Sequence, residues 1–283
     1  MLEIIKAIFY GIVEGITEWL PVSSTGHLIL FEEFFGFKGS PEFIEMFRVV
    51  IQLGAILAVV ILFWNKLFPF SKNKTPIERK NTWLMWLNVI IACLPAAVIG
   101  LKFDDDMDRL FYNFPTVAIT LIIYGVAFII IENMNKSGKL KLKLDNIHNM
   151  PIKTALFIGI FQLLSLIPGT SRSGSTILGA IILGCSREVA AEFSFFLAIP
   201  VMVGASLLKV AKYALAISAG EAILTMGEIG ILIAGTISAF VVSLLIIKFL
   251  MNFIKKHDFK IFGWYRIALG IILLIYFAVK NII

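Results

Sequence analysis

A short stretch near the start of the chain combines two carboxylates, several hydroxyls and a histidine. Glu14 and Glu18 are four residues apart, which places both carboxylates on one face of a helix. The surrounding segment is apolar, and ionisable groups in such a segment are costly, so a functional role is the default interpretation. The pair could bind a divalent cation, or one member could stay protonated and act as acid or base. The alternative is a surface helix with both acids in water.

The hydroxyls follow where a second helix is predicted to begin. Free backbone N–H groups and hydroxyls at a helix start form a site for anions, although each hydroxyl alone would be explained as a helix cap. His27 follows Ser24 by three residues, so their side chains can share a site. We predict Ser24 as the nucleophile and His27 as its partner in proton transfer. The alternative, in which His27 itself is the nucleophile, stays open. The predicted phosphate contacts here are Ser23, Thr25 and Gly26.

A second motif, residues 168–176, repeats this design and adds an arginine. Arg172 is a permanent cation whose planar fork of donors suits phosphate oxygens. At membrane depth it needs an anionic partner, which could be Glu14 or Glu18. An arginine, several hydroxyls, an acid pair and a histidine can together perform phosphoryl transfer. The predicted phosphate contacts in this motif are Thr170, Ser171, Arg172, Ser173, Gly174 and Thr176.

Composition places both motifs in an all-α integral membrane protein. Of 283 residues, 59% are hydrophobic and 16% are charged, which is more apolar than a soluble domain of this length. Several apolar segments are long enough to cross a bilayer, and they must be helical because each backbone polar group there needs a partner within its segment. The predicted spans are residues 45–64, 82–100, 112–131, 188–208, 228–250 and 262–280.

The chain also resembles itself at a shift of 148 residues, which aligns Ser23 with Ser171 and Gly26 with Gly174. We therefore predict two repeats, residues 1–147 and 148–283, within one membrane domain. Each repeat contains three of the predicted spans. Since an odd number of crossings reverses the direction of the chain, the second repeat is predicted to be inverted in the membrane.

Each repeat begins with a segment that is too broken to span the bilayer. Residues 1–35 and 152–184 both contain an apolar helix, a break at Pro21 or at Pro168-Gly169, and a short second helix. We predict two re-entrant hairpins that enter from opposite sides and meet near the midplane, as in inverted-repeat transporters. Irregular backbone at that depth is tolerated where it lines a wet cavity, so the tips should line one.

Charged residues outside the motifs gather in loops. The net charge is +6, and most lysines lie in residues 66–80, 136–153 and 248–260. By the positive-inside rule these loops are cytoplasmic, so the basic balance does not indicate nucleic acid as a partner. An acidic run is expected to form a solvated, outward-facing loop rather than a cation site. It consists of Asp104, Asp105, Asp106 and Asp108.

The two motifs resemble those of the undecaprenyl-diphosphate phosphatases, the bacterial bacitracin-resistance proteins. The likeness covers nearly the whole chain, and its motifs correspond to residues 14–27 and 168–174 without departure at charged, histidine or serine positions. The resemblance implies removal of one phosphate from a C55 isoprenoid diphosphate, which recycles the lipid carrier of bacterial cell-wall synthesis.

The same resemblance implies a location in the bacterial inner (plasma) membrane and a pocket that opens to the outer face. It implies dependence on a divalent cation, which we expect to be Mg²⁺ or Ca²⁺ held by Glu14 and Glu18, without an organic cofactor. It also implies a homodimer surrounded by membrane lipids, with a polyprenyl diphosphate as substrate.

Other functions fit parts of the pattern. An anion carrier, or a flippase of the lipid carrier, would share the inverted repeats and broken helices. It would need Arg172 but would have little use for an acid pair beside Ser24 and His27. A non-catalytic lipid-binding subunit would tolerate loss of Glu18 or Ser24, whereas a catalyst would lose orders of magnitude in rate.

Overall fold

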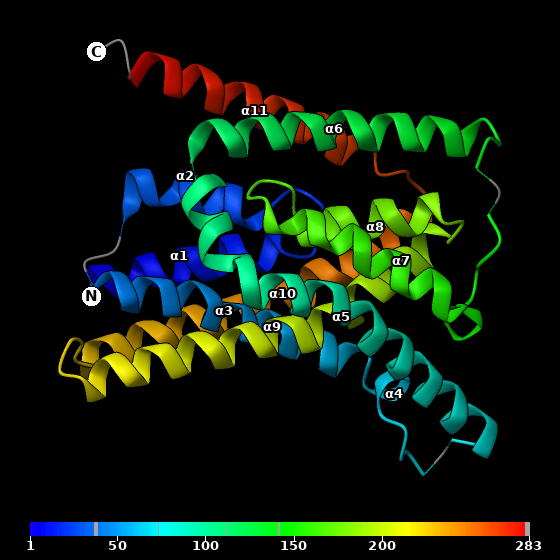
Figure 1. The fold of residues 1–283 in the computed structure, drawn as a ribbon, viewed down its shortest axis with the longest axis horizontal. Coiled ribbons are helices and arrows are strands. Elements are labelled where there is room, and N and C mark those ends of the chain that lie inside the picture. The colour runs from blue at the N-terminus through cyan, green and yellow to red at the C-terminus, as the bar shows by residue number, and fades with distance from the viewer. Residues whose placement is uncertain (37–38, 73, 112, 141, 281–283) are drawn as a thin grey trace.

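The computed structural model describes residues 1–36, 39–72, 74–111, 113–140 and 142–280. Over these ranges the regular structure is helical, and most helices run along the length of the molecule (Figure 1). The elements are α1 Leu2–Thr17, α2 Ser24–Phe35, α3 Pro41–Leu62, α4 Trp64–Leu67, α5 Pro76–Phe111, α6 Phe114–Lys136, the 3₁₀ helix η1 Ile147–Asn149, α7 Ile152–Gln162, the 3₁₀ helix η2 Leu163–Leu166, α8 Arg172–Ile182, α9 Arg187–Ser218, α10 Met226–Ile254 and α11 Lys260–Lys280.

Six helices in the described ranges are long and apolar enough to cross a membrane, as the sequence predicts. They are α3, α5 as far as Gly100, α6, α9, α10 and α11. Several extend beyond the predicted spans, and α9 continues to Ser218 instead of ending at residue 208. The six spans are therefore confirmed in length and composition.

The acidic run was wrongly predicted to be a loop. The backbone from Gly100 to Phe111 continues α5, because no glycine or proline interrupts it after Gly100. The structure does not describe the side chains of the four aspartates, Asp104, Asp105, Asp106 and Asp108. The prediction about a cation site at this run therefore lies outside the described residues.

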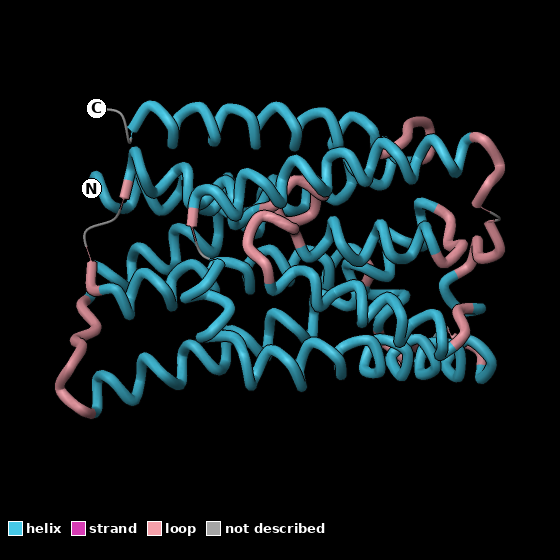
Figure 2. Tube along the Cα trace, turned by 45° about the horizontal axis from the view of Figure 1, so that its top comes forward, coloured by secondary structure: helices cyan, strands magenta, loops and turns pink. Residues whose placement is uncertain are grey.

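Two helical hairpins fill the remainder of the molecule. Lys6 Nζ donates to the Gly36 carbonyl at 2.8 Å, so α1 begins beside the end of α2. The Lys143 amide donates to the Gly184 carbonyl at 2.8 Å, so the chain entering α7 lies beside the end of α8. The hairpins open toward opposite ends of the molecule, and their connecting segments lie in its middle (Figures 1 and 2).

Prolines account for the breaks in both hairpins. A proline ring clashes with the carbonyl four residues earlier and offers no N–H group. Pro21 therefore fits the end of α1 at Thr17, four residues before it. Pro168 likewise follows α7, which ends at Gln162 and passes into the single 3₁₀ turn η2.

Helices of the first half pack against helices of the second half. A Cβ on Gly11 of α1 would lie 2.3 Å from the Gly235 carbonyl of α10, and one on Gly159 of α7 would lie 2.3 Å from the Ala92 carbonyl of α5. Small residues permit such close approach between membrane helices. The first helix of each half thus packs on the second long helix of the other half. The helices α3 and α9 also contact each other, as do α6 and α11.

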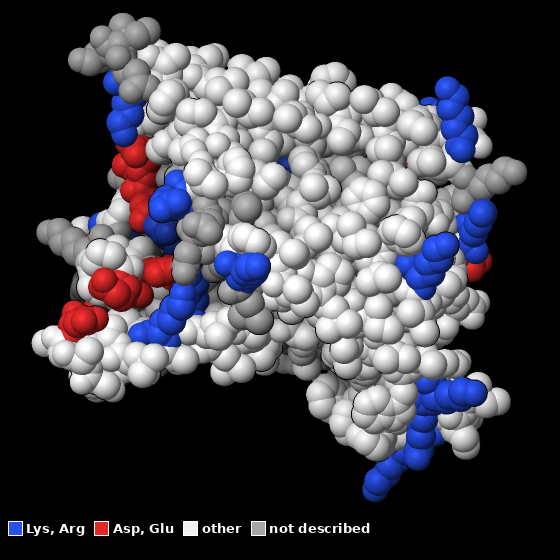
Figure 3. Space-filling model, in the orientation of Figure 1, with Lys and Arg blue, Asp and Glu red and all other residues white. Residues whose placement is uncertain are grey.

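Basic side chains gather at one end of the molecule. The loops after α4, α6 and α10 all lie at this end, opposite the start of α1 and the end of α11 (Figure 1). On the face shown in Figure 3, lysine and arginine dominate there, whereas the opposite end carries many acidic side chains as well. The three basic loops thus share one end, as the positive-inside prediction requires.

The core supports the hairpin that contains the arginine motif. Helix α8 is buried from Ser173 to Ile181, and α9 is buried from Val189 to Ala198. These two segments contact each other within the largest hydrophobic cluster. Because interiors of this kind are closely packed, the start of α8 has a rigid support behind it.

Candidate active site

Each hairpin tip ends in a serine with an unusual backbone conformation. The φ angles of Ser23 and Ser171 are 73° and 74°, in the left-handed region that side chains disfavour. Ser23 Oγ accepts from the Gly26 amide at 3.2 Å, and Ser171 Oγ accepts from the Gly174 amide at 3.1 Å. Both serines therefore cap the helix that follows, and strained residues of this kind concentrate at functional sites.

Arg172 and Glu18 join the two tips. Arg172 Nη2 donates to Glu18 Oε1 at 2.8 Å, and Ser24 Oγ donates to Glu18 Oε2 at 2.7 Å. Arg172 Nη1 also donates to the Ser194 carbonyl at 2.6 Å. Charge-assisted bonds between buried groups are strong, so this contact fixes three side chains together. The resting partner of Arg172 is therefore Glu18, an alternative that the sequence left open beside Glu14.

Glu14 lies one helical turn before Glu18 and has a fully buried side chain. Neither of its carboxylate oxygens has a hydrogen-bond partner within the described residues. Because a buried carboxylate without a partner is costly, it must take up a proton or a cation. The predicted divalent cation would satisfy the oxygens of Glu14, whereas both oxygens of Glu18 already accept hydrogen bonds, from Ser24 and Arg172. The described residues contain no cluster of three metal-binding side chains, so further ligands would be water or substrate oxygens.

A cavity of about 190 Å³ lies where the tips face each other. Both helix starts reach it, through Ser24 and Thr25 of α2 and through Arg172 of α8. Helix N-termini attract anions through free N–H groups and the helix dipole. The complete lining is Glu18, Ser24, Thr25, Gln52, Ser165, Ile167, Pro168, Gly169, Ser171, Arg172, Val201, Met202 and Ala205.

The other predicted phosphate contacts do not line this cavity and make contacts within the tips or with α9. Ser173 Oγ donates to the Glu18 carbonyl at 3.0 Å. Thr176 Oγ1 lies 2.7 Å from Ser194 Oγ. Ser23 caps α2, and Thr170 is buried. The predicted residues outside the lining are Ser23, Gly26, His27, Thr170, Ser173, Gly174, Thr176 and Glu14.

His27 makes its contacts away from the pair formed by Ser24 and Glu18. Its Nδ1 lies 2.7 Å from the Ser23 carbonyl oxygen, and its Nε2 lies 2.6 Å from the Tyr265 hydroxyl. The His27 and Tyr265 rings are stacked, with centroids 5.6 Å apart. Both ring nitrogens thus have partners other than Ser24, whose hydroxyl bonds Glu18.

Several residues around the tips were not among those predicted from the sequence. Arg266 of α11 is fully buried and donates to carbonyls of both tips. A lone arginine inside an apolar span is a signal for a functional group, and that signal was present. Gln52 was similarly visible as a polar residue within a span, whereas nothing in the sequence distinguished Ser194 or Tyr265.

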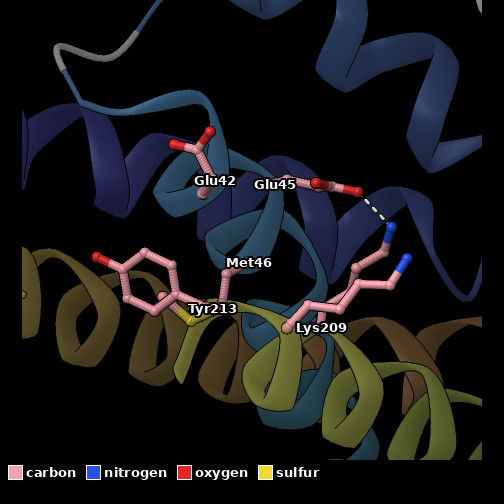
Figure 4. A pocket seen from close by; sticks show the side chains of 6 residues that line it. Glu42, Glu45, Met46, Lys209 and Tyr213 are labelled. Atoms are coloured by element: carbon pink, nitrogen blue, oxygen red, sulfur yellow. Dashed lines mark hydrogen bonds and ion pairs between the residues drawn. The ribbon is translucent and has the colours of Figure 1, made fainter. Parts of the chain in front are cut away.

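A second cavity, of about 180 Å³, lies between the start of α3 and the end of α9 (Figure 4). It shares no lining residue with the first cavity. Lys209 Nζ forms an ion pair with Glu45 at its edge, and the Glu45 side chain is about half exposed. This cavity takes no part in the site at the tips. Its lining consists of Glu42, Glu45, Met46, Lys209, Lys212 and Tyr213.

Fold and site together define a class: a helical membrane protein with a hydroxyl, a carboxylate and an arginine in an internal cavity. The model of one family, bacitracin resistance protein BacA, matches residues 7–272 of the chain. The chain belongs to this family.

Curated relatives are similar over nearly their full length. The undecaprenyl-diphosphatase of Acetivibrio thermocellus is 62% identical over 277 residues, which is 98% of each chain. The undecaprenyl-diphosphatase of Enterococcus faecalis is 61% identical and covers 96% of each chain. The protein of the same name from Streptococcus thermophilus is 55% identical over 100% of this chain and 96% of its own.

Proposed function

We propose that this chain is an undecaprenyl-diphosphate phosphatase, which hydrolyses undecaprenyl diphosphate to the monophosphate and inorganic phosphate. The family and the names of its relatives support this function over the whole chain. The observation that carries it chemically is the contact of Ser24 and Arg172 with one carboxylate, that of Glu18. A nucleophile, a proton acceptor and a phosphate-binding cation thereby share one cavity.

The cavity has room for the diphosphate group but not for a C55 chain. Arg172, the N–H groups at both helix starts and the Thr25 and Ser171 hydroxyls bind the phosphate oxygens. The isoprenoid tail leaves between helices along the apolar wall formed by Val201 and Met202. Binding in this way holds the terminal phosphorus beside Ser24, which removes much of the entropic cost of reaction.

The chemical step begins at Ser24. Its Oγ attacks the terminal phosphorus and passes its proton to Glu18 as the bond to the bridging oxygen breaks. The lipid monophosphate departs with the bridging oxygen, while Arg172 stabilises the charge on the transferring group. Water then attacks the phosphoserine as the bond from phosphorus to the Ser24 oxygen breaks. Glu18 returns its proton to that oxygen, which restores the hydroxyl and the carboxylate, and inorganic phosphate leaves with the oxygen and protons of the water.

His27 positions the nucleophile in this scheme. It holds the Ser23 carbonyl and is itself held by Tyr265, so it stabilises the turn that presents Ser24. The proposal therefore replaces the proton transfer first predicted for His27. Mapping a trapped phosphoenzyme tests the assignment. The label is expected on Ser24, and a label on His27 would overturn it.

We propose that Glu14 and Glu18 hold the divalent cation, Mg²⁺ or Ca²⁺. The unpartnered oxygens of Glu14 support this placement. When bound, the cation supplies positive charge that offsets the charge on the phosphates. Chelation should abolish phosphate release, and added Mg²⁺ or Ca²⁺ should restore it. Full activity after exhaustive chelation would contradict a metal requirement.

The proposed architecture is an inverted repeat with two re-entrant hairpins. The shift of 148 residues, the matching φ angles of Ser23 and Ser171 and the helix packing between the two halves support it. We place the chain in the bacterial plasma membrane, with its basic end in the cytoplasm and its site open to the outer face. The homodimer stays a prediction.

A direct assay separates this function from that of a carrier. Purified protein with Mg²⁺ or Ca²⁺ is given C15 and C55 diphosphates, and released phosphate is measured. We expect release from both lipids. Absence of release, together with movement of a prenyl phosphate across vesicle membranes, would favour a flippase.

A further inference from the structure

One buried arginine bonds both hairpin tips at once. Arg266 lies in α11, and its side chain is fully buried. Its Nη1 donates to the Pro21 carbonyl of the first tip at 3.1 Å. Its Nη2 donates to the Gly169 carbonyl at 2.8 Å and to the Thr170 carbonyl at 2.9 Å, both in the second tip. The guanidinium carbon lies 5.3 Å from the centre of the Tyr124 ring.

These partners differ from those of an ordinary buried ion pair. Among the described residues no carboxylate contacts Arg266, and its hydrogen-bond acceptors are main-chain carbonyls. Carbonyls of a broken helix lack partners within that helix, and inside a membrane they must find others. A planar fork of donors can satisfy carbonyls from two segments together, which the single ammonium group of lysine cannot do in the same geometry.

The bonded carbonyls lie directly before the reacting groups. Pro21 stands three residues before Ser24, and Gly169 stands three residues before Arg172. The glycine at position 174 leaves room for the guanidinium, since a Cβ there would lie 3.2 Å from Arg266 Nη1. Fixing both carbonyls to one rigid group therefore sets the distance between the two tips.

We propose that Arg266 is a positioning residue, which clamps the two tips so that Glu18 and Ser24 face Arg172. It acts through the backbone and does not touch the phosphates. The kinetic consequence rests on the proposed phosphatase function, whereas the effect on the contact between the tips does not.

The kinetic test uses Arg266→Lys, which keeps the charge but loses the fork. Misplacement of the tips should lower kcat by about 10²-fold, because small errors in orientation are that costly. KM should change by less than about threefold, because Arg172 still binds phosphate. Arg187→Lys is the matched control. Arg187 Nε donates to buried Glu132 at 2.9 Å where α9 begins, and its conversion should leave kcat within about threefold.

A second test needs no substrate. Glu18→Gln removes the ion pair with Arg172 and should lower Tm. If Arg266 holds the tips together, that loss of Tm should shrink by roughly half or more in the Arg266→Lys background, because the two groups are coupled. In the Arg187→Lys background it should be unchanged.

The outcomes separate the clamp from its alternatives. Near-normal kcat in Arg266→Lys would overturn the proposal and show that charge alone suffices. A rise in KM at constant kcat would also overturn it, since Arg266 would then act on substrate binding. Equal losses of Tm on Glu18→Gln in both arginine backgrounds would show that Arg266 does not act on the tip contact. If wild-type protein released no phosphate, the proposed phosphatase function would be wrong. The Tm measurements would still test whether Arg266 holds the two tips together.

Discussion

Glu18 accepts one hydrogen bond on each carboxylate oxygen, and these bonds link side chains from two distant parts of the chain. The acid pair, the hydroxyls and Arg172 were recognisable in the sequence because ionisable groups in apolar segments are rare. The sequence could not show whether Glu14 or Glu18 pairs with Arg172. Their helical spacing places both carboxylates on one face but does not identify a partner far along the chain. The partners of His27 were hidden for the same reason, since Tyr265 approaches from α11.

Ser24→Ala removes the proposed nucleophile and the hydrogen bond to Glu18. We expect phosphate release to fall by roughly 10³-fold or more, because the variant lacks the hydroxyl that attacks phosphorus in the proposed step. Ser238→Ala is the control, since the Ser238 hydroxyl lies on α10 and donates within that helix to the Ala234 carbonyl at 2.8 Å. Activity of Ser24→Ala close to that of Ser238→Ala would remove Ser24 from the mechanism.

At the scale of elements, the hairpins provide a shared design for both tips. Their breaks were predictable from Pro21 and from Pro168-Gly169, because proline ends a helix. The left-handed φ of Ser23 and Ser171 was not predictable, since serine normally avoids it. Both serines have this conformation where they cap the following helix, with their hydroxyls accepting from the Gly26 and Gly174 amides.

Substitution of Gly169 can test how tightly α6 constrains the second tip. Its φ is +89°, and an added Cβ would lie 2.2 Å from Thr120 Oγ1 and 2.7 Å from the Val117 carbonyl oxygen. Gly138 has a φ of +71° with open space around it. Gly138→Ala should therefore cost about 1–2 kcal/mol of stability from backbone strain alone.

Gly169→Ala combines that strain with the overlap. It should lower Tm further than Gly138→Ala does and should reduce phosphate release by the folded protein, because the tip must move. Thermal unfolding in detergent and kinetics on monodisperse protein measure the two effects. Equal behaviour of the two variants would show that α6 does not constrain the tip.

At the scale of the molecule, the spans followed from apolar length, and the grouping of basic loops followed from their lysines. The extension of α5 through Phe111 escaped prediction because four aspartates suggest a solvated loop, although they do not break a helix. The packing of helices from one half against those of the other was also not predictable from the sequence. Glycines indicate where helices can approach closely, but they do not show which helix is the partner.

Orientation in the membrane can be tested with single cysteines. Cys93 and Cys185 are first replaced by alanine, and Ser137→Cys and Ser218→Cys are then introduced separately. Ser137 follows α6 at the basic end, and Ser218 ends α9 at the opposite end (Figure 1). A membrane-impermeant thiol reagent added to intact cells should label only Ser218→Cys, because basic loops stay in the cytoplasm. The reverse pattern would invert the proposed topology.

The most direct test of the whole account is phosphate release from C15 and C55 diphosphates by wild type and by Arg172→Ala. The variant loses the contact between the tips and the cation for phosphate, so its kcat/KM should fall by roughly 10³-fold or more. Arg79→Ala, exposed in the first turn of α5, should match wild type. Retention of wild-type kcat/KM by Arg172→Ala would contradict an active site at the meeting of the two tips.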